Sequence, residues 1–162
     1  MANDAYLRLK GQKSGDIKGP VTRTGRKDAI RVIAFSHDVI SPRDAASGLP
    51  TGKRKHKPII ITKEIDRTSP LLMNMLVTNE NITQWELSFW QRNANGKEGP
   101  YFTIRLTNAS IAGIRQEKIN DQQPDGVQMK EREHISFCYQ KIEWIYVDGG
   151  VTAEDDWESP VV

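Results

Sequence analysis

Cysteine and long apolar runs are nearly absent from this sequence. Cys138 is the single cysteine among 162 residues, so no disulfide can form within the chain and packing must stabilise the fold, as in a reduced cytoplasmic protein. No stretch approaches the roughly 20 apolar residues that a membrane-spanning helix needs. The first residues, MANDAYLRLKGQ, lack the basic segment and apolar run of a secretory signal peptide. We therefore expect neither membrane insertion nor export by a signal peptide.

Aromatic residues are missing from the most basic part of the chain. No Phe, Tyr or Trp occurs between Asp38 and Gln84, although this region contains the basic run GLPTGKRKHKP, Gly48 to Pro58. Proteins that bind single-stranded nucleic acid combine basic grooves with aromatic side chains on which the bases stack. The run has no such platform nearby, and charge runs usually form solvated faces. A generic module that binds an anionic ligand or nucleic acid remains the alternative function.

The basic run also lacks the pattern of a phosphate-binding loop. A Walker loop requires G-x-x-x-x-G-K-[ST] between a strand and a helix, because backbone amides and the helix N-terminus hold the phosphates. Here Gly48 and Gly52 are one residue too close, Arg54 occupies the hydroxyl position, and a strand is expected to follow. An exposed loop is the better interpretation.

Catalytic and metal-ligating patterns are missing as well. The histidines and the cysteine are too scattered for a zinc motif, and the two adjacent carboxylates near the acidic end lack a partner for acid–base work. The residues considered are His37, His56, His134, Cys138, Asp155 and Asp156. We therefore expect no catalytic residues, no cofactor and no metal site, and hence no enzyme.

What the sequence has in abundance is alternating, β-branched strand patterns. Residues 5–10 place Ala5, Leu7 and Leu9 on one face, with Tyr6 on the solvent face. Residues 29–40 are apolar on both faces, which favours one strand covered on both sides. Residues 57–65 form a third short strand that begins near Pro58.

The middle and end of the chain add one helix and further strands. Ser69 and Pro70 begin a helix that Asn79 ends. Residues 82–111 read as a long hairpin around the Asn95-Gly96 turn. The apolar phase of residues 133–147 shifts near Lys141, which indicates a bulge or a barrel corner.

Together these patterns predict about seven strands and one helix. Such a set of elements is typical of a mainly β fold, an antiparallel β-barrel of two sheets with one lateral α-helix. Apolar residues make up 37% and charged residues 27% of the chain, an ordinary balance for an ordered protein. The length suits one domain, which we expect to span residues 1–162.

Several longer runs support a resemblance to a known family. They are FSHDVISPRDAASGLPTGKRKHKPIIITKEIDRTSPLL, YFTIRLTNASI, HISFCYQKIEWIYVDGG and a closing EDDW. The chain resembles, over essentially its whole length, the Hcp family of bacterial type VI secretion tube proteins. Residues Ser41 to Pro70 carry the most specific part of this resemblance.

The resemblance implies a structural role. Proteins of this family look like phage tail-tube subunits: six subunits close into a ring, and rings stack into a hollow tube. The expected partners are further copies of the chain, a VgrG spike, a contractile sheath and effector proteins in the lumen, without nucleic acid or membrane insertion. The expected location is the bacterial cytoplasm during assembly, followed by export to the medium or a target cell without a signal peptide.

The distribution of charge suggests how copies could meet. Net charge is only +2, but residues 41–58 are strongly basic, whereas no Lys or Arg follows Glu143. We expect loop 42–57 to reach a neighbouring subunit or the next ring, with carboxylates near the C-terminus as acceptors. The loop residues in this hypothesis are Arg43, Asp44, Lys53, Arg54, Lys55, His56 and Lys57, and the acceptors are Asp155 and Asp156.

Overall fold

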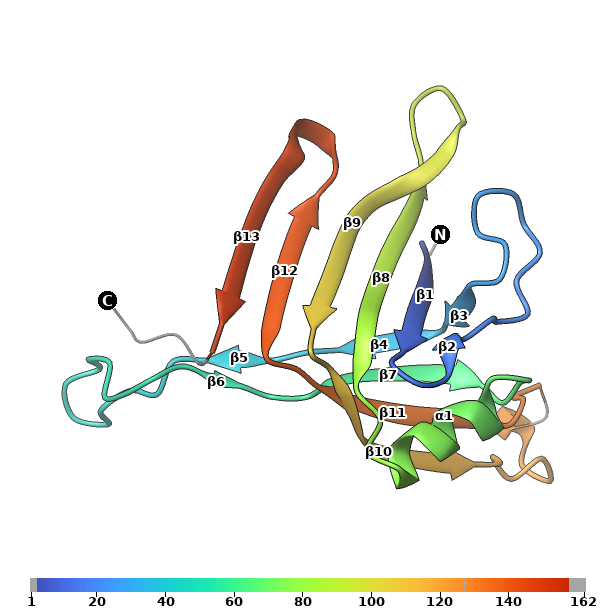
Figure 1. The fold of residues 1–162 in the computed structure, drawn as a ribbon, viewed down its shortest axis with the longest axis horizontal. Coiled ribbons are helices and arrows are strands. Elements are labelled where there is room, and N and C mark those ends of the chain that lie inside the picture. Colours follow the sequence, from blue (N-terminus) through green and yellow to red (C-terminus); the bar gives the residue numbers. More distant parts are fainter. Residues whose placement is uncertain (1–2, 127, 158–162) are drawn as a thin grey trace.

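Strands dominate the computed structural model, which describes residues 3–126 and 128–157. In these residues the chain forms thirteen strands, one α-helix and two short 3-10 helices, and every strand pair is antiparallel. Figure 1 shows two main sheets that cross each other, with the helix beside them. The predicted fold class, mainly antiparallel β with a lateral helix, is confirmed.

The larger sheet has seven strands in the order β13-β12-β9-β8-β1-β2, with β3 also paired to β1. Its strands are β1 (Asp4–Gly11), β2 (Gly15–Asp16), β3 (Ile30–Val32), β8 (Ile82–Arg92), β9 (Glu98–Thr107), β12 (Lys141–Tyr146) and β13 (Val151–Asp156). The strands β1 to β3 therefore lie at one end of this sheet and β13 lies at the other.

The second sheet has four strands in the order β10-β11-β7-β4, and a third has two. The four are β4 (Ala34–Ser36), β7 (Ile59–Glu64), β10 (Ser110–Glu117) and β11 (Arg132–Cys138), and the two are β5 (Val39–Ile40) and β6 (Lys55–His56). Helix α1 (Ser69–Val77) contacts β10, and the 3-10 helices are η1 (Pro124–Gly126) and η2 (Asp148–Gly150).

The core lies between the two main sheets and the helix. Trp85 of the seven-stranded sheet packs against Phe137 of the four-stranded sheet, with ring centroids 5.4 Å apart. Leu72 and Met75 of α1 are fully buried in the same cluster, as their helical spacing predicts. The inward side chains alternate with outward ones along each strand, which is why the period of two was visible in the sequence.

Two features predicted from sequence are confirmed. The hairpin of β8 and β9 turns at Asn95-Gly96, where Gly96 has φ 78°, a value that glycine adopts without strain. It ends at Thr107 and not at the predicted residue 111, because β10 begins at Ser110 and belongs to the four-stranded sheet. The predicted corner near Lys141 is also confirmed, because β11 belongs to the four-stranded sheet and β12 to the seven-stranded sheet. The chain changes sheets there, so its inward face changes phase.

The prediction of a single strand over residues 29–40 is wrong. The segment forms β3, β4 and β5, which pair with β1, β7 and β6 in three different sheets. Ile33, between β3 and β4, is 39% exposed, and its amide donates to the carbonyl of Thr62. The apolar residues on both faces therefore reflect a chain that crosses between sheets, and not one strand covered on both sides.

Tyr6 also differs from its predicted position. Its side chain faces away from the core but is only 4% exposed. The guanidinium of Arg26 lies 5.3 Å from the Tyr6 ring and 4.4 Å from the Trp90 ring, and it forms a 2.5 Å ion pair with Glu98. The loop that contains Arg26 thus folds over the outer face of β1, a long-range contact that a strand pattern cannot reveal.

The start of the helix differs in detail. Thr68, and not Ser69, occupies the N-cap position, and Pro70 lies in the first turn. The Ser69 hydroxyl instead donates to Glu133 Oε1 at 2.8 Å in the buried interior. This hydrogen bond ties the helix to β11.

Candidate assembly interface

A long arm projects from the two main sheets. We define the arm as residues 39–56, which comprise β5, the loop 41–54 and β6; Figure 1 shows it at the left, extending away from the other strands. Val39 pairs with His56 and Ile40 with Lys55, and an isolated bridge joins Arg43 to Pro50 further out. The basic run found in the sequence is therefore one side of a narrow antiparallel ribbon.

Asp44 shapes the tip of the arm. Its Oδ2 accepts hydrogen bonds from the amide and the hydroxyl of Ser47, at 2.9 and 2.7 Å. These hydrogen bonds hold the pKa of the Asp44 carboxyl below its usual value. Gly48 follows with φ 72°, and its amide donates to the carbonyl of Asp44. The acidic residue of the predicted loop set thus forms the turn, while Leu49 beside it is 65% exposed.

The base of the arm is held by a set of hydrogen bonds that we call the clasp, formed by Arg54, His56, Tyr139 and Asp155. Arg54 donates from Nε to Asp155 Oδ2 and from Nη2 to Asp155 Oδ1, each at 2.6 Å. His56 Nε2 lies 2.6 Å from Asp155 Oδ2, and His56 Nδ1 lies 2.7 Å from the Tyr139 hydroxyl. The clasp therefore joins β6 to β13, the last strand.

His37 extends the clasp on the other side of Tyr139. Its Nε2 lies 2.8 Å from the Tyr139 hydroxyl, and burial lowers the pKa of His37. Burial also raises the pKa of the Tyr139 phenol, so this hydroxyl stays protonated and can donate. One set of hydrogen-bond directions fits these three distances: His37 donates to Tyr139, Tyr139 donates to His56, and His56 donates to Asp155.

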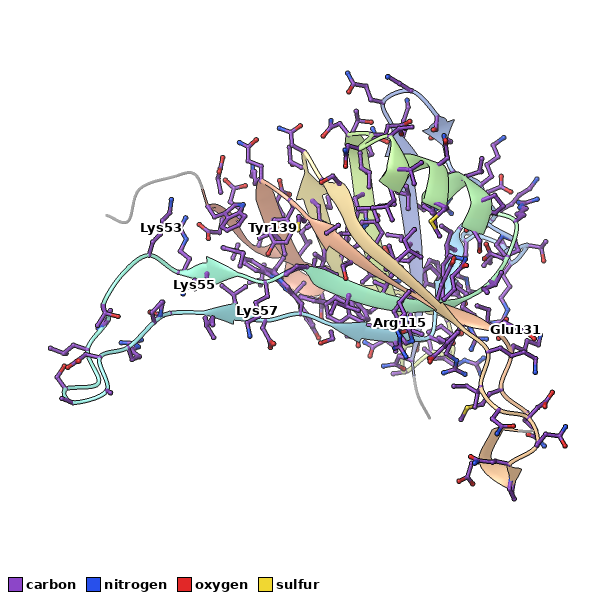
Figure 2. The ribbon with its side chains drawn as sticks, turned by 90° about the horizontal axis from the view of Figure 1, so that it is seen from below. Lys53, Lys55, Lys57, Arg115, Glu131 and Tyr139 are labelled. Atoms are coloured by element: carbon purple, nitrogen blue, oxygen red, sulfur yellow. The ribbon has the colours of Figure 1, made fainter. Side chains whose placement is uncertain are left out.

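Alternation along β6 separates the clasp from the lysines. Arg54 and His56 face Asp155, whereas Lys53, Lys55 and Lys57 are exposed and have no ion pair with any carboxylate in residues 3–126 and 128–157. Figure 2 shows Lys53 and Lys55 on the arm and Lys57 directly after it, with Tyr139 near the base of the arm. A period of two puts the three lysines on one face of the ribbon.

The acidic acceptors predicted from sequence are thus engaged within the same chain. The Asp155 carboxylate contacts both Arg54 and His56, and Asp156 accepts a hydrogen bond from Gln140 Nε2 at 3.1 Å. The Asp156 carbonyl also accepts from Arg54 Nη2 at 2.8 Å. These contacts fix the base of the arm, whereas the basic residues Arg43, Lys53, Lys55 and Lys57 remain exposed.

Sequence reasoning missed Tyr139, His37 and Trp157 as parts of this site. Trp157 Nε1 donates to the Tyr139 carbonyl at 2.6 Å, and its ring lies 5.6 Å from His56. Tyr139 is 83 positions from His56 and 102 positions from His37 along the chain, and no spacing rule connects segments so far apart. The runs quoted for the family resemblance contain all three residues, but they do not show that these residues contact one another.

The clasp should make the base of the arm sensitive to acid. Hydrogen bonds from Arg54 hold the pKa of Asp155 below its usual value near 3.8. A carboxyl with a lowered folded-state pKa stabilises the fold above its unfolded pKa and loses that stabilisation as pH falls through the folded value. In urea unfolding, the free energy of unfolding of the wild type should therefore fall more steeply below about pH 4 than that of Asp155→Asn. Equal slopes for the two proteins would contradict this role.

The described residues were also compared with the requirements of metal, catalytic and membrane-spanning sites. Within the described parts of the chain, no three His, Cys, Asp or Glu residues are placed to hold a metal ion. A groove of about 620 Å³ crosses the outer face of the seven-stranded sheet, lined by residues that include Arg8, Glu86, Arg105 and Glu143. These side chains carry mixed charge and form no catalytic arrangement. None of the described helices is long and apolar enough to span a membrane.

Comparison with known proteins agrees with the fold and the arm sequence. A family described as "Type VI secretion system effector, Hcp" matches residues 6–146. The chain is 38% identical to the "Major exported protein" of Pseudomonas aeruginosa strain PAO1, with 99% of each chain covered.

Solved structures give the same result. A crystal structure of an Hcp protein superposes with a TM-score of 0.90 at 28% identity, covering 98% of this chain and 100% of the other. Hcp1 of Escherichia coli EAEC 042 has a TM-score of 0.85 at 32% identity, covering 96% and 99%. Secreted Hcp3 of Pseudomonas aeruginosa has a TM-score of 0.78 at 30% identity, covering 98% and 100%.

Proposed function

Because the chain belongs to the Hcp family of type VI secretion proteins, we propose that copies of it close into six-membered rings that stack into a hollow tube. The chain is a structural tube protein of type VI secretion and not an enzyme, and its relative is an exported protein.

The projecting arm is the observation that carries the proposal. Its apolar side chains Val39, Ile40 and Leu49 are 41%, 44% and 65% exposed, and Figure 1 shows the loop between β5 and β6 extending past both main sheets. Ordering a ribbon costs conformational entropy, and this ribbon buries too little apolar surface to offset that cost by itself. Docking against another surface would bury these side chains and offset it. A neighbouring copy, in the same ring or the next, supplies that surface.

In this arrangement the residues have different roles. Arg54 and His56 hold the base of the arm against Asp155, and Asp44 shapes the tip. Arg43 and the three lysines contact the neighbouring copy. The remaining partners follow from tube assembly: a VgrG spike at the tip, a contractile sheath around the tube, and effector proteins in the lumen. We place assembly in the bacterial cytoplasm and export through the secretion system itself.

The mass of the protein in solution tests this proposal. Light scattering should give a mass near six times the 18.4 kDa of one chain, and negative-stain images should show rings. A monomer that shifts nucleic acid in a gel, with binding that falls steeply as salt rises, would instead support the alternative of an anionic-ligand module.

A further inference from the structure

The two ends of the seven-stranded sheet carry opposite charge. At one end, residues 13–31 contribute β2, most of β3 and the loop between them, with six cations against two carboxylates, a net charge of +4. At the other end, residues 141–156 form the hairpin of β12 and β13, with five carboxylates against one lysine, a net charge of −4. One of the five, Asp155, is also paired with Arg54 of the arm. We call these the basic end and the acidic end. Figure 1 shows them on opposite sides of the sheet.

A row of charges across the outer face of the sheet points to what the acidic end lacks. Strand registers align Arg8, Glu86, Arg105, Glu143 and Glu154, one from each of five neighbouring strands. The signs alternate up to Glu143, and Arg105 Nε donates to Glu86 at 3.0 Å. Two carboxylates then stand opposite each other, an arrangement that destabilises a strand pair. A cation from outside this strand pair, placed next to Glu154, would relieve this repulsion.

Within the described part of its own chain, the acidic end has a single lysine near these two carboxylates. Lys141 Nζ lies 3.5 Å from Glu143 and 3.0 Å from Glu154, so one lysine serves two carboxylates. The Glu154 side chain is 62% exposed, and Asp148 in the turn is exposed as well. β13 pairs only with β12 among the described strands, so its outer edge is open to another chain.

The basic end has the reverse imbalance. Arg23 and Arg31, with side chains 63% and 60% exposed, each lie 3.6 Å from the same carboxylate, that of Asp4. Lys18 and Lys27 are exposed and have no carboxylate within ion-pair distance in the described residues. Arg8 donates to the Lys27 carbonyl at 2.9 Å and holds this loop against the sheet. The excess cations are therefore presented on an ordered surface.

We propose that the basic end of one copy docks against the acidic end of the next. This inference rests on the proposed function and names the contact that closes the ring. Because the two surfaces differ and lie at opposite ends of one sheet, the contact is head-to-tail, and repeated rotation closes such contacts into a ring. Single surface ion pairs contribute little. Complementary patches instead orient the copies and exclude wrong contacts, and every ring repeats them.

Charge reversal with rescue by mixing tests the contact. One variant carries Asp148→Lys and Glu154→Lys, and a second carries Arg23→Glu and Lys27→Glu. Each pair of reversals brings the net charge of its end to zero while the other end keeps its charge, so each variant alone loses the attraction between the two ends. Light scattering at low salt should then show the fraction in rings falling by about tenfold or more. An equimolar mixture should recover rings in which the two variants alternate. Lys97→Glu, an exposed reversal in the turn between β8 and β9, should leave the rings unchanged.

The outcomes separate this inference from the function on which it rests. If the wild type forms rings and either reversed variant does so equally well, the contact lies elsewhere and the tube function stands. If both variants lose rings, keep the wild-type circular dichroism spectrum and fail to assemble when mixed, complementarity between the ends is wrong. If the wild type itself stays monomeric at every concentration, the proposed function and this contact are both overturned.

Discussion

Replacing Lys63 with methionine should lower the free energy of unfolding by about 3 to 5 kcal/mol, because it leaves a buried carboxylate without its cation. Lys63 and Glu133 are both 0% exposed, face each other across β7 and β11, and form an ion pair of 2.6 Å. Methionine keeps most of the length of the lysine side chain, so the loss reports charge and hydrogen bonding more than volume.

The surroundings of this ion pair explain the size of the effect. Lys63 Nζ also donates to the Glu64 carbonyl, to Asp66 and to Ser69, and Glu133 accepts from Ser69 and Gln116. Every polar atom of the pair therefore has a partner in the interior, as a stable buried network requires. The network also connects both strands to the first turn of α1.

Thermal or urea unfolding measures this prediction. For a chain of this length the expected loss corresponds to a fall in Tm of roughly 6 to 20 °C. The double variant Lys63→Met with Glu133→Leu should lose less than Lys63→Met alone, because the fully buried Glu133 carboxylate is removed together with its cation. Lys118→Met, at an exposed pair with Asp121, serves as the control and should leave Tm unchanged. A Tm for Lys63→Met that matches this control would show that the buried pair contributes little.

Asp155→Ala should release the arm and thereby reduce assembly while the main sheets stay folded. The substitution removes the acceptor of Arg54 and of the buried His56, whose side chain is 1% exposed. Without it, this end of the arm loses three hydrogen bonds to the Asp155 carboxylate and keeps the pairing of β6 with β5, the hydrogen bond between His56 and Tyr139, and that from Arg54 to the Asp156 carbonyl. Amide hydrogen exchange in β5 and β6 should become about tenfold faster or more, since local opening then requires breaking fewer contacts.

A second variant separates holding the arm from docking it. Lys53→Glu, Lys55→Glu and Lys57→Glu together should leave exchange in β5 and β6 near the wild-type rate but still lower the fraction of protein in rings or tubes. Asp121→Ala, a carboxylate far from the arm in sequence, should change neither quantity. If Asp155→Ala assembles as the wild type does, the clasp is not needed for the arm to act; if the triple lysine variant assembles fully, the lysines are not the contact.

The sequence predicted the features that depend on neighbouring residues. Alternation marked the inward face of β8, the Asn95-Gly96 dipeptide located the hairpin turn, and the phase change near Lys141 located the corner between the sheets. The arm sequence supported the resemblance to the family that the comparisons confirm. Each of these signals reflects local backbone geometry, so the side chains that carry it lie within one strand or turn.

The contacts that define the candidate interface depended on the tertiary structure. No local pattern shows that residues 29–40 enter three sheets, that Arg54 finds Asp155 within its own chain, or that Lys63 faces Glu133 in the core. Strand order and register decide these pairings, and they follow from packing two sheets and a helix together. The sequence alone determined which residues carry charge and which strands can form, whereas the tertiary structure decided which charges are paired and which remain exposed for another copy.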